Sequence, residues 1–452
     1  MAQVGPLEVA EVTALTLEGR GVVRPAGKRV LVPGALAGEE IGFRRLRRRR
    51  NYDEGELVDV RRASPDRVVP ACPYFGVCGG CALQHLSPDA QVALKQATLL
   101  DNLARLADLA PATVLPPIRD AVWGYRRKAR LAVRHVEKKG RVLVGFREAG
   151  KPWVADMQDC STLLPSLSRL IEPLSGLIGE LSLRARLPQV EVTAADNAVA
   201  LVFRVLDPPT RNDRALFSEF AARHRVRVYL QPGNESTVAL LAMETGLERG
   251  LEPGVQPGME DLHYRLPAFD LELSFGPTDF IQIHDGINGR MIDQAVALLA
   301  PAPTDRVLDL YCGIGNFTLP LARRAAEVVG VEGSAVAVSR GRANAAANGL
   351  TNARFVEADL GGAGAEGAWT REHFDLVLLD PPRTGALELL PALGRLKARR
   401  IVYVSCHPGT LARDAALLVR GHGYHLAQAG IMDMFPHTSH VESMALFERV
   451  AR

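Results

Sequence analysis

The stretch that decides the fold of this 452-residue chain is Arg306-Val-Leu-Asp-Leu-Tyr-Cys-Gly-Ile-Gly-Asn-Phe317. Its first five residues predict a buried strand, and the residues from Tyr311 onward predict a glycine-rich turn that opens a helix. Glycines in such a turn let the backbone approach a ligand at the amino end of the helix. A single Gly-x-Gly is weak by itself, so the neighbouring segments decide its interpretation.

Further predicted strands follow this stretch, and each of them ends in an acidic residue. The first ends at Glu332, where an acidic side chain holds ribose hydroxyls in nucleotide-binding folds. The next ends at Asp359, a place for a carboxylate near an adenine amine, and the third runs into Asp380-Pro-Pro-Arg383. From about residue 263 strands and helices alternate, which predicts a mostly parallel, doubly wound α/β sheet with these ends in one crevice. The alternative is a generic α/β sheet with loop carboxylates.

Two more residues turn a nucleotide-like site into a reactive one. Cys406 follows the predicted strand 401–404, so it should face the same crevice. Glu442 precedes the predicted final strand 444–450, which could return its carboxylate to that place. A thiolate and a carboxylate base are a workable pair for covalent catalysis. The alternative for Cys406 is a small packing residue, which is how we interpret Cys312.

Three other cysteines are clustered and predict a metal centre. Cys72, Cys78 and Cys81 form Cys-x5-Cys-x2-Cys, with glycines that let the backbone wrap around a small inorganic group. In a cytoplasmic chain such a cluster more often binds a metal than forms disulfides. Three thiolates need a fourth ligand, for which Cys160 is the candidate, and both zinc and an iron–sulfur cube remain open at this point. Four unconnected core cysteines are the alternative.

The patterns divide the chain into three regions. The first alternates short β-rich runs with glycine turns, which predicts a small barrel. The second has mixed signals: a helix about 90–109, whose surroundings at 90–118 we expect to pack on the last region, and basic strands at 130–134 and 142–146. No apolar run is long enough to span a bilayer and no secretory signal is present, so a cytoplasmic location is expected. The predicted domains are 1–62, 63–262 and 263–452.

The net charge of +3 hides a segregation of charge. Residues 119–151 contain 11 Lys/Arg and 3 Asp/Glu, a net +8, and residues 1–70 contain 13 and 10, a net +3, which leaves −8 for the rest. A basic band on a mildly acidic body is typical of proteins that bind a polyanion. The dominance of arginine over lysine suits phosphate contacts, but it equally fits a bias in genome composition.

Five motifs follow one another along the chain: the three-cysteine cluster, Tyr311-Cys-Gly-Ile-Gly-Asn-Phe317, Asp380-Pro-Pro-Arg383, Ser405-Cys-His-Pro408 and His440-Val-Glu442. In this order they resemble the S-adenosylmethionine-dependent RNA uracil-5-methyltransferases. The resemblance is to their iron–sulfur branch, typified by bacterial 23S ribosomal RNA enzymes, and it covers nearly the whole chain. Three positions depart from the usual pattern: His407 and His284 where the family commonly has Asn, and Tyr311 where Phe is frequent.

The resemblance implies a domain architecture and a set of site residues. The N-terminal barrel would be a TRAM domain with an OB-like fold, the central α+β domain would carry a [4Fe–4S] cluster, and the last domain would be a Rossmann-like methyltransferase. Cys406 would be the nucleophile, Glu442 the base and Asp380 a further catalytic group. The implied cluster ligands are Cys72, Cys78, Cys81 and Cys160, and the implied S-adenosylmethionine contacts are Gln282, Tyr311, Asn316, Glu332, Asp359 and Asp380.

The expected reaction is methylation of C5 of a uridine in RNA, most readily 23S rRNA, by a monomeric enzyme. The thiolate adds to C6 of uracil, C5 takes the methyl group, and the base then removes the C5 proton. The target base must swing out of its RNA surroundings to reach the pocket, and the barrel and basic band would hold phosphates. Two alternatives remain: the same chemistry on a tRNA uridine, and a non-catalytic RNA-binding protein that carries zinc.

Overall fold

The computed structural model describes residues 5–241, 262–361 and 367–450. The chain forms two compact units, each assembled from segments distant in sequence. The first unit contains the chain up to Ala97 together with Phe146–Ala155 and Phe435–His440, and the second contains Thr98–Gly145, Asp156–Met434 and the residues from Val441. Within the described ranges, none of the helices has the length and apolarity that a bilayer crossing requires.

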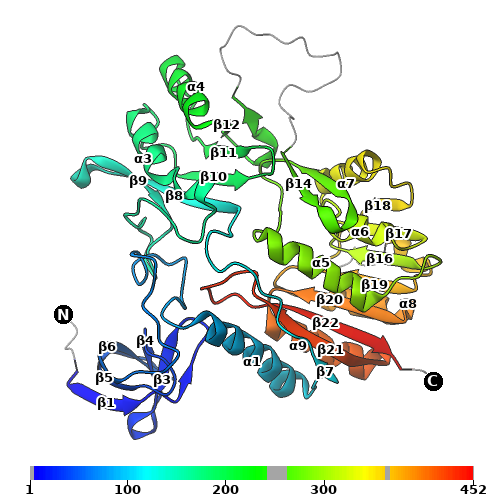
Figure 1. The fold of residues 1–452 in the computed structure, drawn as a ribbon, viewed down its shortest axis with the longest axis horizontal. Coiled ribbons are helices and arrows are strands. Elements are labelled where there is room, and N and C mark those ends of the chain that lie inside the picture. The colour runs from blue at the N-terminus through cyan, green and yellow to red at the C-terminus, as the bar shows by residue number, and fades with distance from the viewer. Residues whose placement is uncertain (1–4, 242–261, 362–366, 451–452) are drawn as a thin grey trace. The chain divides into compact units, whose positions relative to one another are not determined.

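The first unit contains a six-stranded sheet in the order β1-β5-β6-β4-β3-β2 (Figure 1). Its core is a cluster of four valines with Ala35, Ile41 and Phe43. Val30 and Val32, and likewise Ile41 and Phe43, are two residues apart on their strands and so face the same side. The short β-rich runs predicted in this region are strands. Helix α1 (Pro88–Ala107) begins in this unit. The strands are β1 (Leu7–Glu11), β2 (Ala14–Leu15), β3 (Arg20–Val23), β4 (Val30–Pro33), β5 (Glu40–Arg48) and β6 (Asp53–Arg62).

The arginine-rich run at 44–50 includes the end of strand β5, which the sequence analysis did not predict as a strand. Phe43 is buried, while the side chains of Arg44 and Arg47 are exposed. Arg45 is held by ion pairs of 2.7 Å to Glu8 and 2.8 Å to the buried Asp53. The run of like residues conceals the alternation of the strand, because one of the arginines is satisfied by carboxylates on neighbouring strands.

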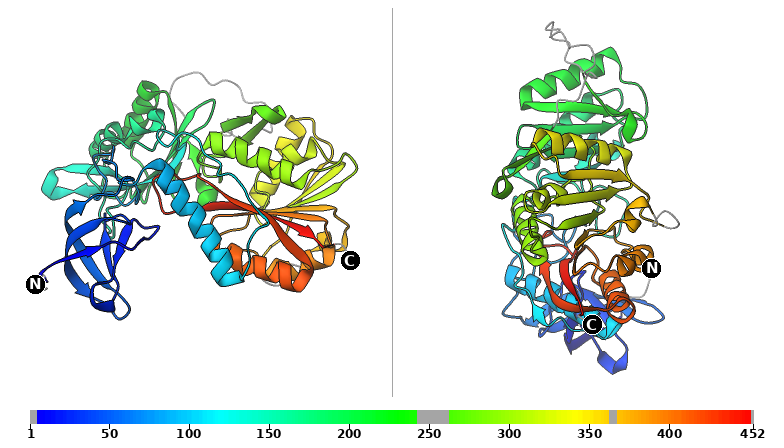
Figure 2. Two further views of the ribbon diagram at one scale, coloured as in Figure 1. Left: turned by 60° about the horizontal axis from the view of Figure 1, so that its bottom comes forward. Right: turned by 90° about the vertical axis from the view of Figure 1, so that its right-hand side faces the viewer.

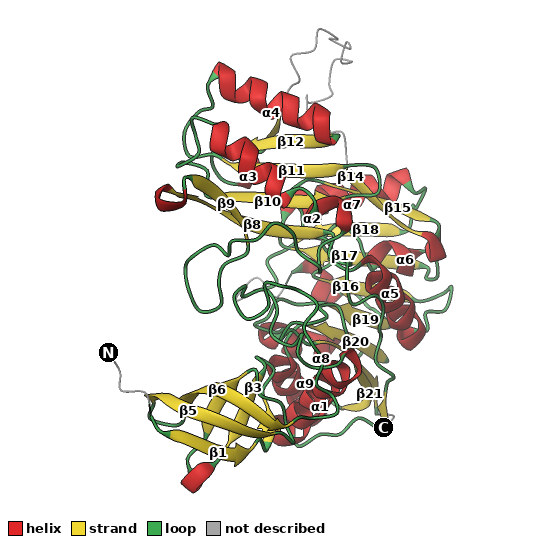
Figure 3. Ribbon diagram, turned by 60° about the vertical axis from the view of Figure 1, so that its left-hand side comes forward, coloured by secondary structure: helices red, strands yellow, loops and turns green. Residues whose placement is uncertain are grey.

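The second unit contains a central sheet in the order β13-β12-β11-β10-β8-β9. Helices α3 (Ile171–Glu180) and α4 (Arg211–His224) lie along one of its faces (Figure 3). The basic strands predicted at 130–134 and 142–146 are part of it. The strands are β8 (Lys128–Val136), β9 (Arg141–Gly145), β10 (Gln189–Ala194), β11 (Val199–Arg204), β12 (Val226–Gln231) and β13 (Ala239–Leu240).

The second unit also contains an eight-stranded sheet in the order β18-β17-β16-β19-β20-β22-β21-β7. The five strands β16 to β20 are parallel, and helices α5 (Asp285–Leu299) and α9 (Pro408–His422) cover opposite faces (Figure 2). The predicted doubly wound fold is therefore confirmed. The strands are β7 (Thr113–Val114), β16 (Arg306–Leu310), β17 (Glu327–Glu332), β18 (Ala353–Glu357), β19 (Leu376–Leu379), β20 (Arg400–Ser405), β21 (Tyr424–Met432) and β22 (Glu442–Arg449).

Strand β22 runs antiparallel to both of its neighbours, β20 and β21. It therefore starts at the edge where the parallel strands finish, so Glu442, its first residue, lies at the carboxyl edge of the sheet. A two-stranded hairpin of β14 (Leu262–Leu266) and β15 (Leu271–Phe275) precedes α5, and the other helices of this part are α6 (Thr318–Ala322), α7 (Ala335–Ala347) and α8 (Leu390–Leu396).

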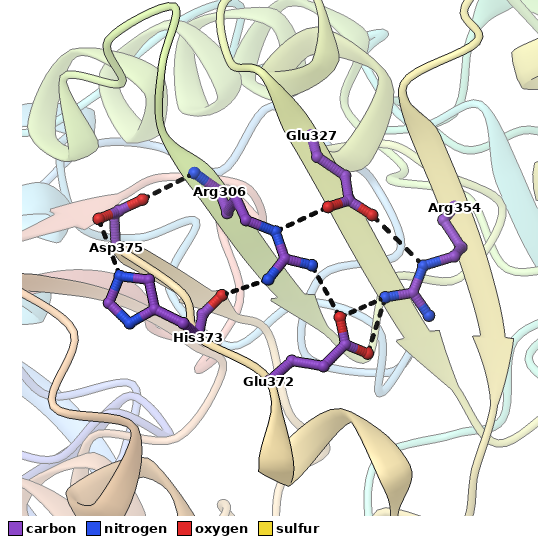
Figure 4. A network of polar contacts seen from close by, with 6 residues as sticks. All are labelled: Arg306, Glu327, Arg354, Glu372, His373 and Asp375. Atoms are coloured by element: carbon purple, nitrogen blue, oxygen red, sulfur yellow. Dashed lines mark hydrogen bonds and ion pairs between the residues drawn. The ribbon is translucent and has the colours of Figure 1, made fainter.

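The opposite, amino edge of the same sheet is joined by ion pairs. Figure 4 shows Arg306, at the start of β16, between Glu327 and Glu372, each at 2.7 Å. Arg354 lies 2.7 Å from the same Glu372 and 3.5 Å from Glu327. These side chains connect the starts of three parallel strands and thereby stabilise the amino edge of the sheet.

Candidate active site

The glycine-rich loop after β16 turns sharply away from the strand. Its φ angles are positive at Tyr311 (63°), Gly313 (54°) and Gly315 (101°). A Cβ atom at Gly315 would lie 3.1 Å from both Leu319 and Phe355, so the turn requires glycine at this position. The amides of Tyr311 and Cys312 donate to the carbonyl of Val331 at 2.9 and 3.2 Å. A non-glycine residue with positive φ is uncommon and is found at ligand sites.

Glu332, the last residue of β17, closes onto this loop. One oxygen of its carboxylate accepts from the amide of Gly313 at 3.2 Å, and the other accepts from the amide of Ser334 at 2.9 Å. The carboxylate is thereby held beside the loop, at the carboxyl edge of the sheet. This is the position that the sequence predicted for a ribose-binding acid.

Two carboxyl groups at this edge, those of the buried Asp309 and the partly buried Asp380, have raised pKa values. Burial raises the pKa of Asp380 to about 7. Burial also raises the pKa of Asp309 to about 7, and the charges of Asp380 and Glu332 add to the effect, although Thr318 donates to Asp309 at 2.5 Å. The second carboxyl oxygen of Asp309 is buried and has no hydrogen-bond partner among the residues that the structure describes. Perturbed carboxyls in a cleft are typical of functional sites.

Cys406 and Glu442 meet through the register of strands β20 and β22. Ser405 pairs with Ser443, and the hydroxyl of Ser443 donates to the carbonyl of Ser405 at 3.1 Å. Cys406 is the next residue beyond Ser405 at the end of β20, and Glu442 is the first residue of β22, just before Ser443, so both lie at the carboxyl edge of the sheet. Each is partly buried.

The electrostatics of Cys406 reflect this neighbourhood. Burial raises the pKa of its thiol, the charges of Glu442 and Asp380 raise it further, and the charge of Arg383 opposes them. The predicted base Glu442 and the acid Asp380 are therefore close enough to the predicted nucleophile to influence its thiol. The helix that follows Cys406 is capped by His407, whose ring nitrogen accepts from the amide of Thr410 at 3.2 Å.

Asp359, Tyr311 and Gln282 are three further residues that were predicted to contact S-adenosylmethionine. Asp359 is exposed, two residues beyond the end of β18, and accepts from the amide of Gly361 at 2.9 Å. Burial raises the pKa of Tyr311 to about 12, with contributions from the charges of Glu388, Asp414, Asp359 and Glu332. Gln282 is partly buried, two residues before the cap of α5.

Asn316 lies at the far end of the glycine-rich loop and belongs to a polar network. Its side-chain oxygen accepts from the hydroxyl of Tyr264 at 2.9 Å and from the amide nitrogen of Asn288 at 3.1 Å. Its own amide nitrogen donates to the side-chain oxygen of Asn288 at 2.9 Å. Tyr264, Asn288 and Asp309 were not predicted from the sequence as site residues. Only Asp309 carried a signal, as a carboxylate within an otherwise apolar strand.

The cysteines of the predicted metal centre lie in different units. Cys72, Cys78 and Cys81 belong to the first unit, in a loop where the amide of Gly80 donates to the sulfur of Cys78 at 3.4 Å. Cys160 is buried in the second unit, with its sulfur 3.2 Å from the hydroxyl of Thr162. Across the described ranges, no three His, Cys, Asp or Glu side chains form a group that could hold a metal ion. Thiols at this spacing have the right chemistry for the ligands of a metal cluster.

The basic band at 119–151 is not one continuous binding face. The side chain of Arg127 is 6% exposed and forms ion pairs of 2.7 Å with Asp196 and 2.8 Å with Asp285. Lys128 is 13% exposed and pairs with Glu191 at 2.9 Å. Net charge in the sequence did not distinguish these buried cations from exposed ones such as Arg134. Neutralising Arg127 or Lys128 would therefore test the stability of the fold and not the binding of RNA.

Known proteins resemble this chain over nearly its whole length. Residues 268–450 match the family model described as tRNA (Uracil-5-)-methyltransferase. The chain is 51% identical to the 23S rRNA (uracil(1939)-C(5))-methyltransferase RlmD of Alkalilimnicola ehrlichii, over 99% of this chain and 97% of the relative. It is 48% identical to the protein of the same name from Methylococcus capsulatus, over 97% and 96%. The crystal structure of Pyrococcus abyssi tRNA (uracil-54, C5)-methyltransferase in complex with S-adenosyl-L-homocysteine matches with a TM-score of 0.73 and 26% identity, over 97% of this chain and 99% of that one.

Proposed function

The chain belongs to the RNA uracil-5-methyltransferase family, and on this basis we propose that it transfers a methyl group from S-adenosylmethionine to C5 of a uridine in 23S rRNA. The observation that carries the proposal is the placement of Cys406 and Glu442 next to the paired residues Ser405 of β20 and Ser443 of β22. A methyltransferase acting on adenine or guanine would share a donor site but would need neither of these residues.

The order of chemical steps follows from the weakness of uracil C5 as a nucleophile. The thiolate of Cys406 adds to C6, and the electron pair moves toward the ring carbonyl and makes C5 nucleophilic. The bound donor supplies an electrophilic methyl group on a sulfonium, which C5 accepts. Glu442 then takes the proton from C5, and the returning electron pair expels the thiolate of Cys406. The products are 5-methyluridine, the demethylated donor and a protonated Glu442.

Two neighbours of the thiol assist these steps. Because burial raises the pKa of the Cys406 thiol, thiolate formation needs a compensating charge, and Arg383 supplies a positive one. Asp380, with a pKa of about 7, carries a proton in about half of the molecules at neutral pH. A protonated Asp380 can donate a hydrogen bond to the uracil carbonyl on which negative charge develops.

The donor pocket is proposed to consist of the polar residues at the ends of the parallel strands. Glu332 holds the ribose hydroxyls and Asp359 the adenine amine, while Asn316 and Tyr311 belong to the loop that the donor approaches. Gln282 and Asp380 complete the set.

We also propose that the chain holds an iron–sulfur cluster and is divided into three domains. The spacing of Cys72, Cys78 and Cys81, with Cys160 as the fourth thiol, supports a [4Fe–4S] cluster as in the family's iron–sulfur branch. The six-stranded sheet of the first unit supports a TRAM-like RNA-binding domain within the boundaries 1–62. We propose for the rest of the chain a central domain at 63–262 and a catalytic domain at 263–452, in a monomeric cytoplasmic enzyme. Residues 242–261 of the central domain lie outside the described residues.

Trapping with RNA that contains 5-fluorouridine tests the mechanism. Fluorine cannot leave C5 as a proton does, so the wild-type protein with S-adenosylmethionine should form an adduct that survives denaturing electrophoresis. Unsubstituted RNA is the control and should leave no lasting adduct. Cys406→Ala should form none and should lose methylation by about four orders of magnitude or more. Full methylation by Cys406→Ala would contradict the proposal.

The choice between rRNA and tRNA needs a separate measurement. The close relatives carry rRNA names, whereas the family model and the solved structure carry tRNA names. Cells that lack this protein should lose one or more 5-methyluridines from 23S rRNA and keep those of tRNA. Loss from tRNA alone would transfer the proposed chemistry to the other substrate.

A further inference from the structure

Tyr264, on the hairpin before the methyltransferase sheet, reaches the glycine-rich loop. It lies on β14, is 3% exposed, and donates its hydroxyl to the side-chain oxygen of Asn316 at 2.9 Å. Burial raises the pKa of this hydroxyl above its ordinary value, so it remains a donor across the working pH range. Neither the mechanism nor the motifs assign a role to this residue.

The side-chain amide of Asn316 has one hydrogen-bonding group that is not used within the described part of the chain. Its oxygen has two lone pairs, and both are used, one by Tyr264 and one by Asn288. Its nitrogen has two hydrogens, one of which is donated to Asn288. The second has no acceptor among the residues that the structure describes. Asn316 is partly exposed, so it can present to a ligand only an N–H donor.

Tyr264 is the residue that makes this orientation unique. The reciprocal pair of Asn316 and Asn288 is symmetric, because flipping both amides restores both of their mutual hydrogen bonds. The flipped pair would turn a nitrogen of Asn316 toward Tyr264. The Tyr264 hydroxyl would then be a buried donor without an acceptor, since Asn316 is its acceptor in the described part of the chain. Leaving such a group unsatisfied costs about 1–3 kcal/mol.

The ring of Tyr264 is itself held in place. It contacts the ring of Phe275 with 5.9 Å between centroids, and the guanidinium of Arg127 lies 5.8 Å from its centroid. Arg127 is in turn fixed by Asp196 and Asp285. The buried cation of the basic band therefore stabilises the tyrosine that orients Asn316.

We propose that Tyr264 is a positioning residue that directs the free N–H of Asn316 toward the carboxylate of the methyl donor's amino-acid part. This inference rests on the proposed function. With Glu332 and Asp359 assigned to the ribose and the adenine amine, the carboxylate is the remaining charged acceptor of the donor molecule. A charged acceptor makes the stronger hydrogen bond with an amide N–H.

Binding of two ligands separates positioning from general damage to the site. S-adenosylhomocysteine has the amino-acid carboxylate, and 5′-methylthioadenosine lacks it. In Tyr264→Phe, calorimetry should show about tenfold weaker binding of S-adenosylhomocysteine and unchanged binding of 5′-methylthioadenosine. The KM for S-adenosylmethionine should rise by a similar factor, with kcat nearly unchanged. Equal weakening of both ligands, or none, would overturn the inference.

A second variant tests the direction in which Asn316 faces. Asn316→Asp replaces the outward N–H with an acceptor oxygen, so S-adenosylhomocysteine should bind about a hundredfold more weakly through charge repulsion, and 5′-methylthioadenosine should not. Tighter binding would show that the residue faces the donor's ammonium group and would overturn the inference.

A matched control comes from another buried tyrosine of the same unit. The hydroxyl of Tyr424 donates to the carbonyl of Ala398 at 2.8 Å, away from the loop. Tyr424→Phe loses a similar hydrogen bond and should leave the affinity for both ligands unchanged. If the wild-type protein binds neither ligand, the proposed function fails and the inference fails with it. If the wild type binds both and Tyr264→Phe behaves like Tyr424→Phe, the inference alone fails.

Discussion

The two edges of the eight-stranded sheet are both rich in charged residues, yet their side chains are used differently. At the amino edge Arg306, Arg354, Glu327 and Glu372 neutralise one another through ion pairs of 2.7 to 3.5 Å. At the carboxyl edge Asp309 has a buried oxygen without a partner among the described residues. Beside burial, the charges of Asp380 and Glu332 raise the pKa of Asp309, and those of Glu442 and Asp380 raise the pKa of Cys406. The charged groups of the amino edge are paired with one another, whereas the carboxyl edge keeps acceptor groups that a ligand can use.

The difference teaches that a functional site is recognised by whether its charged side chains are paired, and not by the number of charged residues. A charged side chain in an ion pair stabilises the fold, and its polar atoms are already bonded and so are not available to a substrate. A buried acid with a raised pKa is held at a cost to stability and is therefore typical of a working site. The basic band illustrates the same point, because its buried member Arg127 is saturated by two carboxylates.

The largest effect we predict from this comparison is at the carboxyl edge, in Glu442→Gln. Without the carboxylate the C5 proton is removed slowly, so turnover should fall about a hundredfold or more. The covalent Cys406 adduct should accumulate with ordinary RNA, because addition and methyl transfer precede the lost step. Rapid-quench assays and denaturing electrophoresis measure both quantities.

A different outcome for Glu442→Gln would assign Glu442 to an earlier step of the reaction. If Glu442→Gln slows turnover without accumulating adduct, the residue acts before methyl transfer, for example by taking the proton from the Cys406 thiol. Adding Cys406→Ala to that protein should then remove the remaining turnover, because the thiol is still the nucleophile.

The next effect concerns the two acids with raised pKa values, Asp309 and Asp380, and the charge of the methyl donor. S-adenosylmethionine carries a net positive charge near neutral pH, and S-adenosylhomocysteine carries none. Asp309 and Asp380 have pKa values of about 7, so they are mostly neutral below pH 7. Binding of a cation favours their ionised forms and releases protons. The Kd of S-adenosylmethionine should fall as the pH rises toward 7, by about tenfold per pH unit for each linked proton, and then level off.

Calorimetry between pH 5.5 and 8.5 checks this dependence. Asp309→Asn should flatten the profile for S-adenosylmethionine, and S-adenosylhomocysteine should show a shallower slope in the wild type. The free protein gives a second check of sign. A carboxyl whose pKa is higher when folded than when unfolded makes the fold most stable at low pH, so this contribution is lost as the pH rises from about 4 to 7. Identical slopes for the two ligands would contradict the assignment of these acids to the site.

The sequence predicted the carboxyl edge well because strand ends and glycine turns leave local signals. The predicted strand at Arg306–Leu310 is strand β16, and the polar residue after each strand fell at the correct edge. The antiparallel return of β22 was also expected, although Glu442 is its first residue and does not precede it. These features depend on periodicity and chain order, which the sequence contains.

The rest depended on which side chains meet. Tyr264 and Asn316 are 52 residues apart, and nothing near Tyr264 in the sequence distinguishes it from a core aromatic. The pairing of Arg127 with Asp196 and Asp285 likewise joins distant segments, so a basic band in the sequence became partly a buried ion-pair network. Partners that are distant in the sequence decide whether a charged side chain is paired, and a count of charges does not reveal those partners.

The smallest effect we predict is at the amino edge, and it completes the comparison. Arg306 has about a third of its side chain exposed, so solvent screens its ion pairs, and Arg306→Met or Glu372→Gln should lower the free energy of unfolding by only about 1 kcal/mol. Burial acts to raise the pKa of Glu372, but hydrogen bonds from Arg354 and Arg306 outweigh it and lower the pKa, so this stabilisation should be lost as the pH falls through the acidic range. Urea titrations measure the loss, and kcat/KM should stay within twofold of the wild type. A tenfold fall in kcat/KM, with the fold intact, would show that the amino edge also serves the reaction, because its ion pairs would then be setting the positions of the strand ends that carry Asp309 and Glu332.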